Sequence, residues 1–166
     1  VVLVGHSGGG PIAHGAADAR PDRVRRMVHV DTWPLTHGRC VNDELPVIDA
    51  SIPLPDWSVF EPEDLVDLDD GLKAMFRARA VPEPAAVASD PQVLTDDRRH
   101  DIPTTIVCCE FTGEQLRGWM AGGAPQLAEL ALMRDVEYVD LPTGHWPQFT
   151  RPDDLAAVIL AAIERR

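Results

Sequence analysis

The fold is decided by residues 1–9, VVLVGHSGG. The first four residues are apolar and mostly β-branched, which is typical of a fully buried strand in a parallel sheet. Residues 9–19 follow with the composition of a helix, and Pro11 lies in its first turn, where a missing N–H is tolerated. Residues 24–31 then alternate like a second strand. A strand, a helix and a strand in this order predict one right-handed βαβ unit.

Residues 5–9, GHSGG, match the pattern G-x-S-x-G, in which a serine sits on a sharp turn between a strand and a helix. Such short patterns also occur in ordinary loops, but here a strand precedes the turn and a helix follows it. Glycine is expected to be required at positions 5 and 9, because the turn is sharp and the strand and helix pack too closely there for a side chain. Ser7 is therefore the candidate nucleophile at the carboxyl edge of the sheet, and the Gly8 N–H is the candidate oxyanion donor.

A serine hydroxyl needs a general base to become an effective nucleophile. Of the six histidines, His145 is the best candidate, because it lies in the short loop 143–146 that leaves the last predicted strand. His6 belongs to the turn itself, so its ring is expected to flank Ser7. The others are expected to pack, to face solvent or to lie in or beside the long middle segment, namely His14, His29, His37 and His100.

The middle of the chain, residues 32–101, is rich in proline and acidic residues. Within it, residues 62–80 have apolar positions at helical spacing. The segment is too long to be a simple connection, so it is either a lid or an insertion. The later elements are a strand at 102–109, a helical region in two pieces at 113–133, a strand at 136–141 and a helix at 151–166. This order predicts a parallel sheet covered by helices.

Three stretches together resemble the α/β-hydrolase superfamily, specifically its smaller serine esterase-like members with a lid. They are GHSGG at 5–9, IPTTIV at 102–107 and PTGHWPQFTRPDDLAAVI at 142–159. The resemblance covers nearly the whole chain and keeps the family's order of nucleophile, acid and histidine. It implies an α/β-hydrolase fold, a parallel sheet with helices on both faces and a helical lid insertion. Residues 1–31 and 102–166 would form the core, and residues 32–101 the lid.

The resemblance also implies a hydrolase that cleaves an ester or related acyl substrate through a Ser-His-acid triad, without a cofactor or a metal. A serine in the turn argues against the family branches that use an aspartate nucleophile, the haloalkane dehalogenases and the epoxide hydrolases. Two alternatives stay open. One is a lyase or acyltransferase that reuses the same scaffold, and the other is a binding protein that has lost activity.

The acid is the least certain member of the predicted triad. The family usually places it in a Gly-x-x-Asp pattern after the post-lid strand, but residues 109–112 read CEFT, so Thr112 stands where the aspartate is expected. Asp31 is the favoured replacement, because its strand is expected to lie between the serine strand and the post-lid strand. Glu110, at the end of the post-lid strand, is the alternative acid, and Asp140 is a weaker third candidate.

Aromatic side chains are the candidates for the wall of an apolar substrate pocket. The residues expected there are His6, Trp33, Trp57 and Trp146, with Phe60 near them in the middle segment. For the aromatic residues of the middle segment, ordinary packing explains their presence equally well.

The complete sheet of the family has more strands than this sequence supplies, so the N-terminal strands are expected to be missing. The early half of the family fold normally contributes a second oxyanion donor, whose loss typically costs about 10²–10³ in rate. The strand at 1–4 would also keep an unpaired edge. We therefore expect these 166 residues alone to be inactive and poorly soluble.

The composition limits the possible partners. A net charge of −12 argues against binding to nucleic acid or an anionic membrane, and no apolar run approaches the length of a membrane span. Cys40, Cys108 and Cys109 show no metal-binding spacing and form a poor disulfide framework, which favours a reducing, cytoplasmic location. The expected partner is a small acyl substrate, and the oligomeric state is not indicated.

Overall fold

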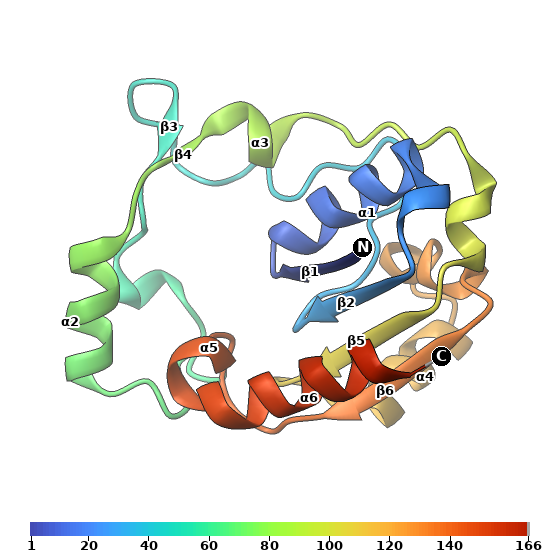
Figure 1. Cartoon of the computed structure of the whole chain (residues 1–166). Coiled ribbons are helices and arrows are strands. Elements are labelled where there is room, and N and C mark those ends of the chain that lie inside the picture. The colour runs from blue at the N-terminus through green and yellow to red at the C-terminus, as the bar shows by residue number, and fades with distance from the viewer. Residues whose placement is uncertain (166) are drawn as a thin grey trace.

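The computed structural model describes residues 1–165, and its centre is a four-stranded sheet in the order β1-β2-β5-β6 (Figure 1). The strands are β1 Val2–His6, β2 Arg26–Val30, β5 Thr104–Cys108 and β6 Val136–Asp140. All three neighbouring pairs are parallel. Because parallel strands end at the same edge of a sheet, the loops that follow these strands meet at one edge, where a site can form.

The remaining elements connect and cover this sheet. The α-helices are α1 Gly9–Ala19, α2 Asp70–Arg79, α3 Ala85–Ser89, α4 Gly113–Ala121, α5 Pro147–Thr150 and α6 Pro152–Glu164. Short 3-10 turns lie at η1 Pro21–Arg23, η2 Trp57–Val59, η3 Asp97–Asp101, η4 Pro125–Leu127 and η5 Leu130–Leu132. Two short strands, β3 Ser51–Ile52 and β4 Glu83–Pro84, pair antiparallel within the middle segment. Among the described residues, no helix is long and apolar enough to cross a membrane.

Helices cover both faces of the sheet, as the sequence predicts. α1 and α4 lie on one face, where Ala17 and Leu116 join core clusters with Met27 of β2 and Ile106 of β5. On the other face, Leu155 of α6 packs against the β2 and β5 side chains that point away from Met27 and Ile106, namely Val28, Val30 and Val107. The central strands β2 and β5 are buried along their whole length.

The first strand is less buried than its sequence predicts. β1 pairs only with β2 among the described residues, so it forms an edge of the sheet. Val4 is consequently 46% exposed, and the expectation of a fully buried strand is wrong for this part of the chain. The apolar composition of β1 is typical of a strand that is covered on both faces, but the described residues do not cover it completely.

The middle segment, residues 32–101, leaves the carboxyl end of β2, extends away from the sheet and returns to β5 (Figure 1). Its helix is shorter than the predicted 62–80. α2 begins only at Asp70, because the Asp69 side chain accepts a hydrogen bond from the Leu72 N–H and caps the helix. Residues 62–67 form turns instead. The second helical piece predicted within 113–133 is present only as two short 3-10 turns, η4 and η5. Arg166, the predicted end of the last helix, lies outside the described residues.

Candidate active site

The turn between β1 and α1 holds Ser7 in a strained backbone conformation, with φ of +49°. The Ser7 N–H donates to the Val30 carbonyl of the neighbouring strand, at 3.1 Å. A Cβ on Gly5 would lie 2.4 Å from the Gly9 carbonyl oxygen, so a side chain is excluded there. The same prediction for Gly9 is wrong, because nothing lies within 4 Å of a Cβ at that position. Gly10 is the second crowded position, where a Cβ would meet Thr32 at 2.4 Å.

The structure brings Ser7, His145 and Asp31 into one continuous chain of hydrogen bonds. The Ser7 hydroxyl lies 2.8 Å from Nε2 of His145, and Nδ1 of His145 lies 2.7 Å from Oδ2 of Asp31. A carboxylate accepts only, so in the neutral imidazole the proton belongs on Nδ1 and Nε2 is left to accept from the serine. This is the arrangement in which an imidazole can remove a proton from a hydroxyl.

Asp31 is buried and held by the backbone of the neighbouring strand end. Its Oδ1 accepts hydrogen bonds from the N–H groups of Cys109 and Glu110, at 3.0 and 3.1 Å. Burial alone raises the pKa of Asp31, but the hydrogen bonds from His145 and from residue 110 outweigh burial and bring the pKa below its usual value. Asp31 is therefore an anion whose second oxygen is directed at His145. Its backbone has φ of +49°, which aspartate tolerates better than most residues.

Glu110, the alternative acid, contacts the same nitrogen of His145 as Asp31 does. Oε2 of Glu110 is 3.0 Å from Nδ1 of His145, so both predicted carboxylates contact the imidazole. Burial raises the pKa of Glu110, the hydrogen bond to His145 opposes this, and the carboxyl groups of Asp64 and Asp31 raise it further, to about 8. Two carboxylates at one site cannot both ionise easily. At neutral pH the protonated member is Glu110 and the charged member is Asp31.

The third candidate and the expected position of the family acid have structural roles. Asp140 accepts a hydrogen bond from the Gly113 N–H at 2.7 Å, at the start of α4. Thr112 caps the same helix, because its hydroxyl accepts from the Gln115 N–H and the Gln115 side chain accepts from the Thr112 N–H. The residue at the usual acid position therefore begins a helix and makes no contact with the histidine.

The carboxylates change the protonation of His145. Burial lowers the pKa of its imidazole, but the hydrogen bonds to Asp31 and Glu110 and the negative charge of Asp31 outweigh burial and raise it to about 9, with Glu110 adding its charge once it ionises. The imidazole is therefore mostly protonated at neutral pH, and the neutral form that can accept a proton increases as the pH rises toward that value.

The loop that carries His145 is held from two sides. The His145 N–H donates to the Asp64 carbonyl at 2.9 Å, and the Gly144 N–H donates to the Val66 carbonyl at 3.3 Å. A Cβ on Gly144 would lie 2.4 Å from the Asp64 oxygen and 2.6 Å from the Val66 oxygen, so only glycine allows this close approach. From the other side, Nε2 of His6 donates to the His145 carbonyl at 2.5 Å. Burial and the nearby His145 charge lower the pKa of His6 to about 4, so this ring is neutral.

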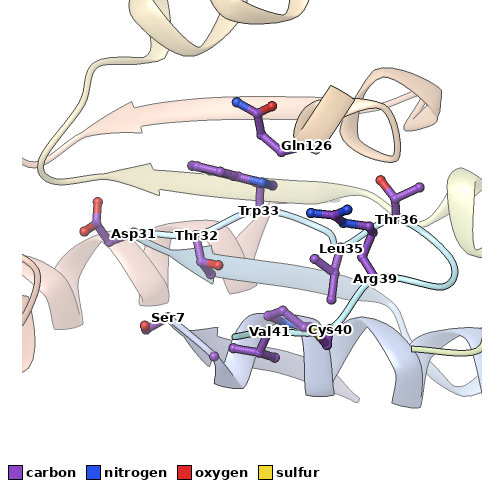
Figure 2. Close-up of a pocket in the computed structure, with 12 residues that line it drawn as sticks. Ser7, Asp31, Thr32, Trp33, Leu35, Thr36, Arg39, Cys40, Val41 and Gln126 are labelled. Carbon is purple, nitrogen blue, oxygen red and sulfur yellow. The ribbon is translucent and has the colours of Figure 1, made fainter. Parts of the chain in front are cut away.

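A cavity of about 320 Å³ opens beside the serine (Figure 2). Ser7, Gly8 and Asp31 lie at one side of it, and Trp33 is part of the wall, where the sequence predicts it. Gly8 precedes the first residue of α1, and its N–H makes no hydrogen bond within residues 1–165. A donor in this position can serve a negative oxygen that develops next to Ser7.

Three residues predicted for the substrate pocket do not line this cavity. His6 supports the His145 loop, and Trp57 and Trp146 pack against each other with ring centroids 5.8 Å apart. They belong to an aromatic cluster that joins the middle segment and α2 to the loop after β6, completed by Phe60, Phe76 and Phe149. Burial of large rings explains their position, because aromatic pairs of this kind are worth about 0.5–1.5 kcal/mol beyond their buried area.

The comparison with known families agrees with this geometry. A model of the alpha/beta hydrolase family matches residues 1–158. The chain belongs to the alpha/beta hydrolase family. It is also 28% identical, over 188 aligned positions, to the lipase LipV of Mycobacterium tuberculosis, and the alignment covers 100% of this chain and 69% of the lipase.

Solved structures share the fold of this alpha/beta hydrolase. An extracellular alpha/beta-hydrolase from a Paenibacillus species superposes with a TM-score of 0.70 at 21% identity, covering 97% of this chain and 71% of that protein. The pyrethroid hydrolase PytH gives a TM-score of 0.63 at 20% identity, covering 99% of this chain and 72% of that protein. At these identities the likeness concerns the fold.

The remaining histidines of the hydrolase lie away from Ser7. His14 and His100 are buried and contact Oε1 of Glu129, at 3.1 and 3.0 Å. His29 is fully buried with no hydrogen-bond partner among the described residues, and burial followed by the His14 charge lowers its pKa to about 3. Nδ1 of His37 accepts a hydrogen bond from the Leu94 N–H at 3.0 Å. His14, His29 and His100 are therefore parts of the buried interior, whereas His37 is exposed and holds the Leu94 backbone.

Sequence reasoning missed several residues that position the site of this hydrolase. They are Asp64 and Val66, which hold the loop of His145, and Gly10, which allows α1 to approach β2. The signal for Gly10 was present in the third consecutive glycine at 8–10. Nothing in the sequence near Asp64 indicates a contact with a loop 80 residues later. Within residues 1–165, Asp31, Glu110 and His145 are also the one group whose ligand atoms, all within 4.8 Å, could hold a metal, but here they bond to one another.

Proposed function

We propose that the protein is a serine hydrolase that cleaves carboxylic esters, with Ser7 as nucleophile, His145 as general base and Asp31 as the residue that orients the imidazole. The observation that carries this proposal is the unbroken hydrogen-bond chain from Ser7 Oγ through both nitrogens of His145 to Asp31, with links of 2.8 and 2.7 Å. The family match and the lipase relative support hydrolysis as the type of reaction.

The proposed reaction has two halves. Neutral His145 takes the hydroxyl proton of Ser7 while Oγ attacks the ester carbonyl, and the carbonyl oxygen becomes negative beside the Gly8 N–H. The carbon–oxygen bond then breaks, and His145 returns the proton to the departing alcohol. Water attacks the resulting acyl-Ser7 ester with His145 again as base, which releases the carboxylic acid and restores the hydroxyl.

The same reasoning assigns a role to the middle segment. Residues 32–101 supply both the cavity wall around Trp33 and the backbone contacts that hold the His145 loop, so we propose that they act as a lid and that residues 1–31 and 102–166 form the core. Three free cysteines suit a reducing, cytoplasmic compartment, whereas one relative in structure is named extracellular. The predicted inactivity of these 166 residues alone stays a prediction, as does the absence of nucleic-acid and membrane partners.

A fluorophosphonate probe tests the central claim, because it forms a covalent bond only with an activated serine. We expect labelling of the natural gene product at Ser7, and loss of labelling and of 4-nitrophenyl ester turnover in Ser7→Ala and His145→Ala. Ser89→Ala, which removes an exposed hydroxyl bonded only to the Ala85 carbonyl, is the matched control and should label normally.

The outcomes separate the rival functions. Labelling with no ester turnover would favour a lyase or an acyltransferase on the same scaffold, which cyanohydrin cleavage and acyl transfer to an added alcohol would then distinguish. No labelling at Ser7 would contradict an enzymatic role for this site and favour a binding protein.

A further inference from the structure

The cavity beside Ser7 has two ends of different character. Its middle wall is apolar and includes Trp33, Leu35 and Val41. In Figure 2, Ser7 and Asp31 lie on one side of the view, and the Arg39 guanidinium and Thr36 lie on the other. A substrate that fills the cavity from the serine therefore passes an apolar stretch before it reaches a polar end.

The polar end has unmet bonding capacity. Arg39 is exposed at this end of the cavity, and its guanidinium forms no salt bridge and no hydrogen bond within residues 1–165, although the chain carries 27 acidic residues against 15 basic ones. The Thr36 hydroxyl is covered by protein and has no hydrogen-bond partner among the described residues. The Gln126 amide, also in the wall, makes no hydrogen bond there either. A guanidinium offers five donors in a planar fork that matches a carboxylate.

The negative charge in the same wall is already neutralised by its own contacts. Asp31 gives one oxygen to two backbone N–H groups and the other to His145. An anion held at Arg39 would therefore lie at the end of the cavity away from this carboxylate.

The position of His145 indicates which half of an ester occupies the cavity. The departing alcohol must face Nε2 of His145 to receive its proton, but His145 is not part of the cavity wall. The group that extends into the cavity is therefore turned away from the histidine, and this is the acyl chain. Gly8 also lines the cavity, beside Ser7 in sequence, so its N–H can serve the carbonyl oxygen of the ester.

We infer that the cavity selects esters whose acyl chain ends in a carboxylate, which Arg39 binds at the end opposite to Ser7. This inference rests on the proposed function and adds the substrate class to it. Monoesters of dicarboxylic acids, with an apolar chain between the two carbonyl carbons, combine the two features that the cavity presents.

A pair of matched substrates tests the inference on the natural gene product. The 4-nitrophenyl monoesters of adipic and suberic acid are compared with 4-nitrophenyl hexanoate and octanoate, which have the same chain length without the charge. These longer diacids avoid attack of the free carboxylate on its own ester. Because an ion pair with an exposed side chain such as Arg39 is worth about 0.2–1 kcal/mol, we expect kcat/KM to favour the charged ester up to about 5-fold at low salt. The preference should shrink as ionic strength rises.

Variants assign the preference to Arg39. Arg39→Gln should bring the ratio of the two kcat/KM values to about 1, and Arg39→Lys should restore part of the preference. Arg23→Gln is the control, because it removes the same charge at the amino-terminal side of β2, remote from the cavity, and should leave both values unchanged. Equal use of both esters by the wild type, or an unchanged ratio in Arg39→Gln, would overturn the inference while leaving the esterase proposal intact. Failure to cleave any ester would instead contradict the proposed function.

Discussion

Replacing Asp31 with asparagine should remove nearly all activity at neutral pH. Asparagine keeps the size of the side chain and tolerates the positive φ of this position. Its carbonyl oxygen should stay with the Cys109 and Glu110 N–H groups, which now bind Oδ1. The amide NH₂ then points at Nδ1 of His145 and forces the imidazole proton onto Nε2, where it blocks proton transfer from Ser7.

The magnitude follows from this wrong tautomer. A carboxylate-to-amide exchange at the orienting acid of a serine triad lowers kcat by about 10⁴. At 1.36 kcal/mol per factor of ten, this is roughly 5 kcal/mol of transition-state stabilisation. Glu110 lies 3.0 Å from the same nitrogen and loses the Asp31 charge that helps to raise its pKa in this variant. Burial and Asp64 still raise that pKa, so Glu110 replaces the lost charge only in part at pH 7.

The pH profile separates the two carboxylates. The wild-type kcat/KM for 4-nitrophenyl hexanoate should rise with pH until His145, with a pKa of about 9, is neutral. Glu110→Gln should lose less than about 10-fold at its optimum, and its rising limb should move to lower pH, because one source of the raised pKa is gone. Asp31→Asn should recover partly as the pH rises and Glu110 ionises, and the double variant should not.

Circular dichroism and thermal melting serve as controls for folding in each variant. An Asp31→Asn enzyme within 10-fold of wild type at pH 7, or a Glu110→Gln loss larger than that of Asp31→Asn, would refute the assignment of Asp31 as the orienting acid. It would instead transfer that role to Glu110.

Three further predictions concern the support of His145. The pKa of His145 is about 9 in the folded protein and 6.5 in the unfolded chain, so protonated His145 stabilises the folded state. This stabilisation is complete below pH 6.5 and is lost as the pH rises through about 9. Urea unfolding between pH 6.5 and 9 should show this loss, about 3 kcal/mol, in wild type on top of the loss that Glu110 causes up to pH 8, and His145→Gln should lack the His145 part. Gly144→Ala should shift the loop and lower kcat about 10²-fold. Gly118→Ala is the control and should leave kcat unchanged, because nothing lies within 4 Å of a Cβ at that position. Equal kcat values for the two variants would contradict the close approach of Gly144 to the Asp64 and Val66 carbonyl oxygens. His6→Phe should lower kcat up to about 10-fold, and His6→Gln, which keeps a donor, should lose less.

Local rules were sufficient for the elements and for two members of the site. The turn at residues 5–9 places Ser7 at a strand end because its signal lies in five consecutive residues. The loop position of His145 follows in the same way from the strand that precedes it. The order of strands and helices also follows from the spacing of apolar residues within short windows, so the parallel sheet could be predicted. The start of α2 was not predicted, because the cap at Asp69, and not the apolar spacing, sets it.

The sequence by itself therefore determined the fold family, and it was enough to propose Ser7 and His145 as members of the site. Only the tertiary structure decided how the acid position is filled, because β2 and β5 are neighbours and their ends direct Asp31 and Glu110 at the same nitrogen. The protonation of this pair depends on burial and on contacts with two other segments, at Asp64 and His145. The cavity depends on how residues 32–41 lie beside Ser7. These properties arise from distances between residues far apart in the chain, and no local pattern in the sequence encodes such distances.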